Sequence, residues 1–375
     1  MSGFGGGISS FILNKATHFK GKNIIFDVLT FDEVPPHFKQ AIEETGGKVY
    51  KMPNPKKAGF RNYYQQVNDN MSQLPKTTFI HCHIRGYRAI PFHVIAKKNG
   101  IKRFGMHAHT TGLPEEINSL KNRRVRWINN LLADERISCG VEASKYLFGE
   151  KYLKKKEIMH IPNSINAEDF IPKLNVTKES LFGSEIKDKY LIGHIGRFYS
   201  VKNHDFMLSI VEKLAQGSLE FMWLFIGDGK DFEGIKKEVK NRNLQNYVHF
   251  LGRRNDIPEI LQSLDLFVLP SKYEGFPTVA VESQASGTKT FLSNRITEEA
   301  DLQLGLVKFL PIENPEIWVE EILETSSDVE TSPLDRLDRL KQLKLTNEES
   351  AQLYEEFLKQ TITHYELDKK EGTNK

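Results

Sequence analysis

The sequence is poor in cysteine and contains no long apolar run. Only Cys82 and Cys139 occur among its 375 residues, each inside an expected buried strand, which predicts two free core thiols rather than a disulfide. No apolar stretch approaches the roughly 20 residues that a membrane-spanning helix needs. The opening MSGFGGGISSF also lacks the pattern of a secretory signal. Together these absences predict a protein that is made and kept in the cytoplasm.

A common cofactor motif is absent as well. A dinucleotide fingerprint requires a strand followed by glycines in the spacing G-x-G-x-x-G, and the first glycines, Gly5 to Gly7, have neither. We therefore exclude a nicotinamide or flavin site there. After these glycines comes an apolar stripe at the spacing of one helix face, made of Ile8, Phe11, Ile12, Ala16 and Phe19. The chain therefore opens with a glycine loop that leads into a helix.

The rest of the sequence alternates short apolar strands with amphipathic helices, in two series. Such alternation predicts parallel sheets covered by helices on both faces, and 375 residues suffice for two domains of this kind facing each other across a cleft. The fold class is thus α/β. The expected parts are an N-terminal Rossmann-like domain over 1–162, a linker over 163–189, a second Rossmann-like domain over 190–345, and a helix with a frayed tail over 346–375.

Charge is divided between the two halves. Through Pro162 there are 26 Lys and Arg against 13 Asp and Glu, and the remainder has 26 against 36. A basic half suits an anionic partner such as nucleic acid or a membrane surface, or it simply keeps the domain soluble. The helix near residues 120–132 combines Leu, Ile and Trp with Lys and Arg, so it could rest on an anionic bilayer, assisted by the lysines at 154–156. It could equally pack its apolar face into the core.

Four successive strand ends in the second series carry glycine or charge. Arg197 and Lys202 follow the first strand, GDG at 227–229 follows the second, and GRRND at 252–256 follows the third. In parallel sheets ligands bind beyond the carboxyl ends of the strands. A guanidinium and an ammonium group at one such end could together bind a diphosphate.

The fourth strand end leads into the segment SKYEGFPTVAVESQASG. Here Glu274 precedes an expected helix, Pro277 occupies the first helical position, and Glu282 lies inside the helix. The free N–H groups of a helix N-terminus attract an anion such as phosphate. The two carboxylates could then lie on either side of one ligand with a central phosphate and sugars at both ends.

The first series contains two His-x-His pairs, His81 with His83 and His107 with His109. Alternate residues of a strand share a face, so each pair could offer metal ligands. Each pair ends a separate strand without a convincing carboxylate partner, and we expect no metal. His81 and His83 then support the structure, although His83 could also face a bound ligand.

The motifs of the second series resemble a known enzyme family. GRFYSVKN, GDG, FLGRRNDI and LDLFVLPSKYEGFPTVAVESQASG are similar to the donor half of the retaining glycosyltransferases of family 4, which have the GT-B architecture. The segment SNRITEEADLQLGLVKFLPI is similar to members encoded in capsular and exopolysaccharide clusters of Gram-positive bacteria. The resemblance covers nearly the whole chain and implies a hexosyltransferase of the EC 2.4 type.

This resemblance implies roles for individual residues of the second series. Arg197 and Lys202 would neutralise the nucleotide diphosphate without a metal, in agreement with the lack of any Asp-x-Asp triplet. Glu282 would hold the ribose hydroxyls. The remaining donor contacts would come from Glu274 with the backbone of Gly275, Phe276, Pro277 and Thr278 at the sugar and distal phosphate, and from Gly252 and Arg253 at the base.

In the first series, the segment HAHTTG aligns His109 with the family's histidine at the cleft, where it would bond the donor sugar or stabilise developing charge. His107 would support the strand end. Gly6 and Gly7 match the family's glycine pair, which approaches the donor phosphate or the acceptor. Family members begin with a strand before these glycines, and that central first strand is missing here. The start assigned to the chain is too late, another segment fills the gap, or the first domain is damaged.

We therefore predict an enzyme that transfers a sugar from a nucleotide donor, a UDP-sugar, with retention of configuration. The acceptor would be a saccharide or lipid-linked saccharide in capsule or exopolysaccharide synthesis, at the inner face of the cell membrane, with no nucleic acid involved. Two alternatives stay open: a nucleotide-sugar epimerase or phosphorylase of the same architecture, and a weakly active accessory subunit of a partner transferase.

Overall fold

The computed structural model describes residues 7–171, 176–325 and 331–372. The chain divides into two compact units, which we call unit 1 (Met1–Ser164 with Asn347–Lys375) and unit 2 (Ile165–Thr346). The expected boundaries differ from these at two places. The segment 163–189 is not a separate connection, because most of it belongs to unit 2, where the 3₁₀ helix η2 (Ala167–Phe170) packs against helices α13 and α14. The last helix returns to unit 1 instead of forming a separate tail.

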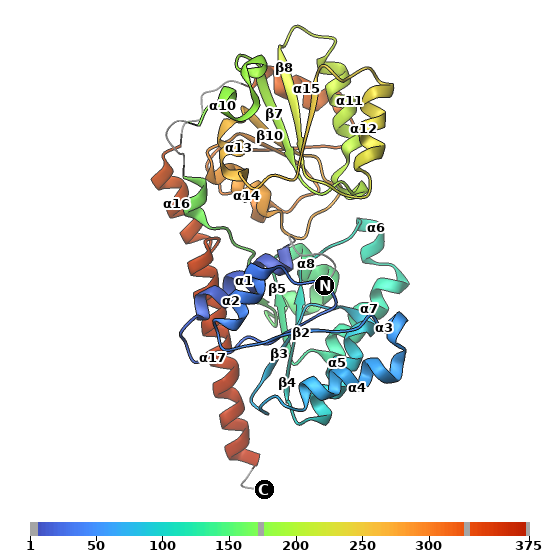
Figure 1. Cartoon of the computed structure of the whole chain (residues 1–375), viewed down its shortest axis with the longest axis vertical. Helices are drawn as coiled ribbons and strands as arrows, with labels where there is room; N and C mark the ends of the chain where they lie inside the picture. The colour runs from blue at the N-terminus through green and yellow to red at the C-terminus, as the bar shows by residue number, and fades with distance from the viewer. Residues whose placement is uncertain (1–6, 172–175, 326–330, 373–375) are drawn as a thin grey trace. The chain divides into compact units, whose positions relative to one another are not determined.

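Unit 1 contains two parallel sheets (Figure 1). One pairs β1 with β2, and the other has the order β3-β4-β5-β6. The apolar run NIIFDVLT at 23–30 is longer than the strand it forms, since only its last three residues pair, as β1. Among the described residues no strand joins β1 to β3. The bounds are β1 (Val28–Thr30), β2 (Val49–Lys51), β3 (Phe79–Cys82), β4 (Arg103–Ala108), β5 (Glu135–Ser138) and β6 (Met159–His160).

Helices surround these sheets and share their core. The N-terminal helix α1 (Gly7–Phe19) and the C-terminal helix α17 (Asn347–Gly372) place Phe11, Phe19 and Tyr354 in one apolar cluster with Ile137 of β5. Polar side chains also join the two helices: the Lys15 ammonium donates to the Ser350 hydroxyl at 2.6 Å. The other helices are α2 (Pro36–Glu43), α3 (Pro55–Ala58), α4 (Phe60–Met71), η1 (Gly86–Ala89), α5 (Ile90–Lys98), α6 (Pro114–Ile117), α7 (Leu120–Leu132), α8 (Val141–Leu147) and α9 (Glu150–Lys154).

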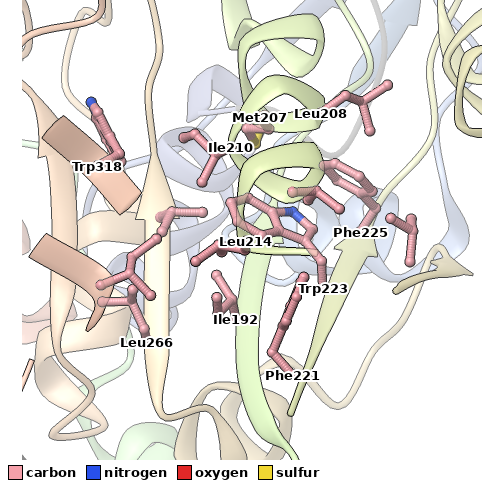
Figure 2. Packing of buried hydrophobic residues seen from close by; sticks show 14 of the residues in the cluster. Ile192, Met207, Leu208, Ile210, Leu214, Phe221, Trp223, Phe225, Leu266 and Trp318 are labelled. Carbon is pink, nitrogen blue, oxygen red and sulfur yellow. The ribbon is translucent and has the colours of Figure 1, made fainter. Parts of the chain in front are cut away.

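Unit 2 is built on one six-stranded parallel sheet of order β12-β11-β10-β7-β8-β9. Strands such as β8 are buried along their whole length, as expected of a parallel sheet covered on both faces. Trp223 and Trp318 lie in its core (Figure 2). The strands are β7 (Tyr190–Ile195), β8 (Phe221–Ile226), β9 (Val248–Gly252), β10 (Leu266–Leu269), β11 (Thr290–Ser293) and β12 (Val307–Leu310).

The helices of unit 2 follow the expected alternation, with additions at the end. The last strand expected from the sequence is KTFLS at 289–293, which contains β11, so β12 and α16 are findings of the structure. The helical segments are α10 (Lys178–Phe182), η3 (Ser184–Ile186), η4 (Ser200–Lys202), α11 (His204–Leu214), α12 (Phe232–Asn241), α13 (Ile257–Ser263), α14 (Thr278–Ala285), η5 (Glu298–Ala300), α15 (Pro315–Glu324) and α16 (Pro333–Gln342).

Two sequence-based expectations about buried groups can be checked directly. Cys82 and Cys139 are both buried and free of any disulfide, as predicted. Among the described residues, none of the helices combines the length and the apolar character that crossing a bilayer requires.

Candidate active site

The predicted donor residues of unit 2 lie where its strands end. Because β7, β8, β9 and β10 are parallel neighbours, their carboxyl ends meet at one edge of the sheet. Arg197 and Lys202 follow β7, Asp228 follows β8, and Arg253 follows β9. The segment with Glu274 follows β10. One sheet edge therefore carries all the loops that the sequence singled out in unit 2.

Glycine lets two of these loops approach each other closely. Gly227 has a φ of 132°, and a Cβ atom built there would lie 2.0 Å from the carbonyl oxygen of Gly196, so no larger residue fits. Backbone bonds hold the contact in place: the Phe198 N–H donates to the Asp228 carbonyl at 2.7 Å, and the Asp231 N–H donates to the Phe198 carbonyl at 3.1 Å. The loop that bears Arg197 is thus fixed against the loop after β8.

Lys202 and Glu274 form an ion pair that the sequence analysis did not anticipate. The Lys202 ammonium lies 2.7 Å from a Glu274 carboxylate oxygen, and the two side chains are 16% and 17% exposed. Two hydrogen bonds join the loops: the Lys272 N–H donates to the Val201 carbonyl at 2.9 Å, and the side chain of Asn203, which adopts the left-handed conformation with φ 62°, donates to the Pro270 carbonyl at 3.2 Å. The pair therefore combines partial burial with access from solvent.

The arginines at this edge of the sheet differ in their exposure to solvent and in their ion pairs. Arg197 is exposed, with its guanidinium 5.5 Å from the centre of the Tyr199 ring. Arg253 pairs with Asp228 at 2.8 Å, although both side chains are more than half exposed. The Arg254 guanidinium, by contrast, donates two hydrogen bonds to the Asp256 carboxylate, at 2.8 and 2.5 Å. Arg197 and Arg253 can reach a ligand, whereas Arg254 stabilises its own loop.

Helix α14 begins one residue later than expected. Pro277 is its N-cap residue, not its first helical residue, and no side chain caps the helix. Gly275, Phe276 and Pro277 are buried, and Thr278 is partly exposed. Since the first N–H groups of a helix need partners from outside it, this end can bind an anion through backbone N–H groups.

Glu282 lies in the middle of α14 with a carboxyl group that is short of partners. Part of its side chain reaches the surface, but the carboxyl group lies among protein atoms, and this burial raises its pKa from 4.5 to about 7. No hydrogen bond or ion pair links the Glu282 carboxylate to any other residue in the part of the chain that the structure describes. The carboxylate is largely enclosed, keeps some access to solvent and has no protein partner, so ligand hydroxyl groups could donate to it.

The four histidines of unit 1 gather around one aromatic ring. The ring of Phe11 on α1 lies 4.8 to 5.9 Å from all four imidazoles. His81 and His107 are joined at 3.0 Å, and His83 and His109 at 2.7 Å. Burial lowers the pKa of all four imidazoles, that of His83 to about 3, so they are neutral near pH 7. Neutral imidazoles supply N–H donors rather than positive charge.

Sequence reasoning missed three residues of this cluster, Phe11, Lys15 and Tyr354. The hydroxyl of Tyr354 on α17 lies 2.8 Å from Nδ1 of His81. The Lys15 ammonium lies 5.0 Å from the Phe11 ring centre, and burial lowers its pKa to about 7. The signal for Lys15 was its place in the apolar stripe of the first helix. For Tyr354 the sequence offered none, because its partner is 273 positions away.

Three of these histidines could in principle hold a cation. One ring nitrogen each from His81, His83 and His107 lies within 4.8 Å of the other two. Three imidazoles alone can hold zinc, but here ring nitrogens already bond in pairs, His81 with His107 and His83 with His109. We therefore keep the expectation of a hydrogen-bonded imidazole cluster without a metal. Of the two glycines singled out in this half, Gly7 is exposed at the start of α1, and Gly6 lies outside the described residues.

Residues 176–303 match the family model of glycosyl transferases group 1, and they include Arg197, Lys202, Glu274 and Glu282. This part of the chain belongs to the glycosyl transferases group 1 family. This glycosyltransferase is 29% identical to the putative glycosyltransferase EpsF of Bacillus subtilis over 330 residues, which are 86% of this chain and 85% of EpsF.

A second relative matches a smaller part of the glycosyltransferase. It is the Escherichia coli UDP-Gal:alpha-D-GlcNAc-diphosphoundecaprenol alpha-1,3-galactosyltransferase, which is 31% identical over 150 residues, 39% of this chain and 38% of its own. Among solved structures, Anabaena HepE in complex with UDP-glucose superposes with a TM-score of 0.76 at 18% identity, covering 96% of this chain and 98% of HepE. The fold of the glycosyltransferase is thus GT-B, as its sequence motifs implied.

Proposed function

We propose that this glycosyltransferase transfers a hexose from a UDP-sugar, with retention of configuration, to a saccharide or lipid-linked saccharide acceptor in exopolysaccharide synthesis. The observation that carries the proposal is the arrangement after β10. A solvent-accessible Lys202–Glu274 ion pair lies in the loops beside an uncapped helix end, and that helix carries the unpartnered carboxylate of Glu282. Cations, free backbone N–H groups and a carboxylate suit the diphosphate and ribose of a nucleotide sugar.

Each group in this arrangement has a proposed task. Arg197 and Lys202 neutralise the diphosphate as it departs, assisted by the backbone N–H groups of Gly275, Phe276 and Thr278, so that no metal ion is required. Such preorganised charge is usually the largest contribution to catalysis. Because Lys202 now pairs with Glu274 at 2.7 Å, the ion pair also holds the Glu274 carboxylate in place for the hydroxyls of the donor sugar.

The nucleoside and the sugar use further residues. We propose that Glu282 accepts hydrogen bonds from the ribose hydroxyls and that Gly252 and Arg253 lie at the base. From unit 1, we propose that neutral His109 bonds the donor sugar, and that Gly6 and Gly7 lie near the phosphate or acceptor. Nε2 of His109 is occupied by His83, whereas its Nδ1 has no partner among the described residues and is the atom left for this bond.

The comparisons support the donor and acceptor classes. HepE has been crystallised with UDP-glucose, and the Escherichia coli relative is named for a UDP-galactose donor and a diphosphoundecaprenol-linked acceptor. EpsF carries a name consistent with transfer of a sugar. A lipid-linked acceptor requires that the enzyme work at a membrane surface.

The proposal can be tested by turnover with a panel of UDP-sugars and a membrane extract as acceptor source. We expect Arg197→Ala and Lys202→Ala each to lower donor turnover by roughly two or more powers of ten, the usual scale for losing one preorganised charge. Lys237→Ala, on the exposed face of α12, is the matched control and should keep wild-type turnover. Turnover should also persist in EDTA.

Unchanged turnover in both variants would contradict the diphosphate role. Product analysis without acceptor separates the rival enzymes, since an epimerase converts the donor alone and a phosphorylase needs free phosphate. Calorimetry with UDP gives a further check, because failure to bind UDP would favour a weakly active accessory subunit.

A further inference from the structure

Helix α7 in unit 1 turns three of its large apolar residues toward solvent, although Leu132 is buried. Its buried positions include Asn122 and Asn129, whereas Leu120, Trp127 and Leu131 are 71%, 67% and 65% exposed. An ordinary surface helix buries its apolar stripe and exposes its polar face. The sequence left both orientations of this helix open, and the structure excludes packing of these three side chains in the core.

Specific hydrogen bonds fix this orientation. The Asn129 side chain accepts from the Gly86 N–H at 2.7 Å and donates to the Leu147 carbonyl at 3.2 Å. Asn122 donates to the carbonyls of Ile117 and Tyr146 at 3.1 and 3.2 Å. Rotating the helix to bury its apolar stripe would break these bonds and leave buried polar groups without partners. The exposed stripe is therefore a fixed feature of the surface.

The apolar surface continues onto the neighbouring elements. The 3₁₀ helix η1 packs against both α7 and α5, and α5 is on the same side of unit 1 as α7 (Figure 1). Tyr87, Ile90 and Val94 on these elements are 66%, 37% and 47% exposed. Six of the twelve large hydrophobic residues with high exposure among those described thus lie on η1, α5 and α7.

The charge on η1, α5 and α7 themselves is of one sign, while exposed Glu115 and Glu116 lie on the preceding helix α6. Residues 86–98 and 120–132 contain seven Lys and Arg and no Asp or Glu. Lys121, Arg123 and Arg124 are exposed on α7, and Arg124 lies one helical turn from both Leu120 and Trp127. None of the three takes part in an ion pair among the described residues. Unit 1 as a whole has 30 Lys and Arg against 20 Asp and Glu, while unit 2 has 22 against 29.

We propose that this surface docks on an anionic lipid membrane. We call it the α5–α7 patch: the apolar residues Tyr87, Ile90, Val94, Leu120, Trp127 and Leu131 with the basic residues Lys121, Arg123 and Arg124. Trp and Tyr rings settle at the boundary between headgroups and acyl chains, and Lys and Arg bind the anionic headgroups. The patch brings the enzyme to the lipid-linked acceptor of the proposed function, but binding to vesicles is measured without turnover.

Tryptophan fluorescence reports on this patch selectively. Of the three tryptophans, Trp223 and Trp318 are fully buried in unit 2 while Trp127 is 67% exposed. Vesicles of equal phosphatidylcholine and phosphatidylglycerol should shift the emission to shorter wavelength and protect it from acrylamide. Pure phosphatidylcholine should give a much smaller effect, and raising the salt from 0.05 to 0.5 M should reverse the shift because it screens the charges.

Co-sedimentation with the same vesicles tests the two components of the patch. Replacing Leu120, Trp127 and Leu131 together by Ser should weaken partitioning more than ten-fold. Replacing Lys121, Arg123 and Arg124 by Gln should weaken it by a similar or larger factor, since each basic residue near an anionic surface contributes roughly five-fold. All six side chains are exposed, so the fold should persist, as circular dichroism would verify.

Matched controls come from unit 2. Leu323 and Leu334 are 57% and 72% exposed, and their double replacement by Ser removes two exposed leucines, as the Ser variant of the patch does, but no tryptophan. Lys236, Lys237 and Lys240 are exposed on α12, and their replacement by Gln removes the same charge as in the basic variant. Both controls should bind vesicles within two-fold of wild type.

Several results would overturn the proposal. Equal binding to neutral and anionic vesicles at every salt concentration would do so, as would patch variants that bind like the controls. A dimer that forms without lipid, protects Trp127 from acrylamide and dissociates in the Ser variant would assign the patch to a second copy instead. A chain that binds vesicles through the patch but does not bind UDP would refute the donor assignment and support the docking proposal.

Discussion

Replacing Glu282 by Gln should separate the stability of unit 2 from its affinity for UDP. Burial raises the pKa of Glu282 from 4.5 to about 7. Between pH 4.5 and 7 the folded chain therefore binds more protons than the unfolded chain, and its stability falls as the pH rises through this window. At 1.36 kcal/mol for each pKa unit, the cost above pH 7 is about 3 kcal/mol.

Gln keeps the shape of the side chain and cannot ionise. We therefore expect Glu282→Gln to be about 3 kcal/mol more stable than wild type at pH 8 and less than about 1 kcal/mol more stable at pH 5. Urea unfolding followed by tryptophan fluorescence reports on the right part of the molecule, because Trp223 and Trp318 lie in the core of unit 2 (Figure 2). Glu320→Gln, an exposed position on α15, is the control and should change stability at neither pH.

The same variants measure the ribose contact. A ligand at 100 times its dissociation constant stabilises the folded state by about 2.7 kcal/mol, so UDP should stabilise wild type and Glu320→Gln alike. Glu282→Gln loses a hydrogen bond to a charged acceptor, worth about 1.5 to 3 kcal/mol, and should need at least ten times more UDP for the same stabilisation. Equal stability of Glu282→Gln and wild type at pH 8 would refute the burial argument. Equal UDP affinity would refute the ribose role.

Two further substitutions test the packing of each unit. Lys15→Met should stabilise unit 1. Burial lowers the Lys15 pKa to about 7, so wild-type stability rises between pH 7 and 10.5. In urea unfolding followed by circular dichroism, the gain in stability should be about 2 kcal/mol larger at pH 7 than at pH 9, and a gain independent of pH would contradict the burial argument. Gly227→Ala should destabilise unit 2 by about 3 kcal/mol or more, since its Cβ would lie 2.0 Å from the Gly196 carbonyl oxygen at a φ of 132°. Urea unfolding followed by tryptophan fluorescence measures this loss. Gly234→Ala is the control, because a Cβ atom there meets no neighbouring atom.

The sequence predicts most strands and helices of both units because their apolar runs are strongly periodic. It also predicts which strand ends carry the candidate donor residues, since the carboxyl ends of parallel strands share an edge. It could not predict that Lys202 pairs with Glu274, because the two are 72 positions apart and either could have bound solvent or ligand. Nor did it identify β12, since the strand at Val307–Leu310 is short and only one of its residues is buried.

Helix α7 shows a second limit of sequence patterns. Periodicity identifies an apolar stripe but does not say whether the core or the solvent covers it. Here the answer depends on Asn122 and Asn129, whose amides bond to carbonyls of α8 and of the segment before α7. Those partners are visible only once the helices are placed, so the sequence could indicate the α5–α7 patch but not establish its exposure.

The C-terminal helix α17 acts on the histidine cluster of unit 1, contrary to the expectation of a separate tail. Burial raises the pKa of Tyr354, so its hydroxyl stays protonated and can donate to Nδ1 of His81 at 2.8 Å. Donation from Tyr354 leaves the His81 proton on Nε2, bonded to Nδ1 of His107 at 3.0 Å, whereas acceptance by Tyr354 reverses both bonds. In either arrangement, a tyrosine near the end of the chain is bonded into the cluster that contains His109, the proposed contact of the donor sugar.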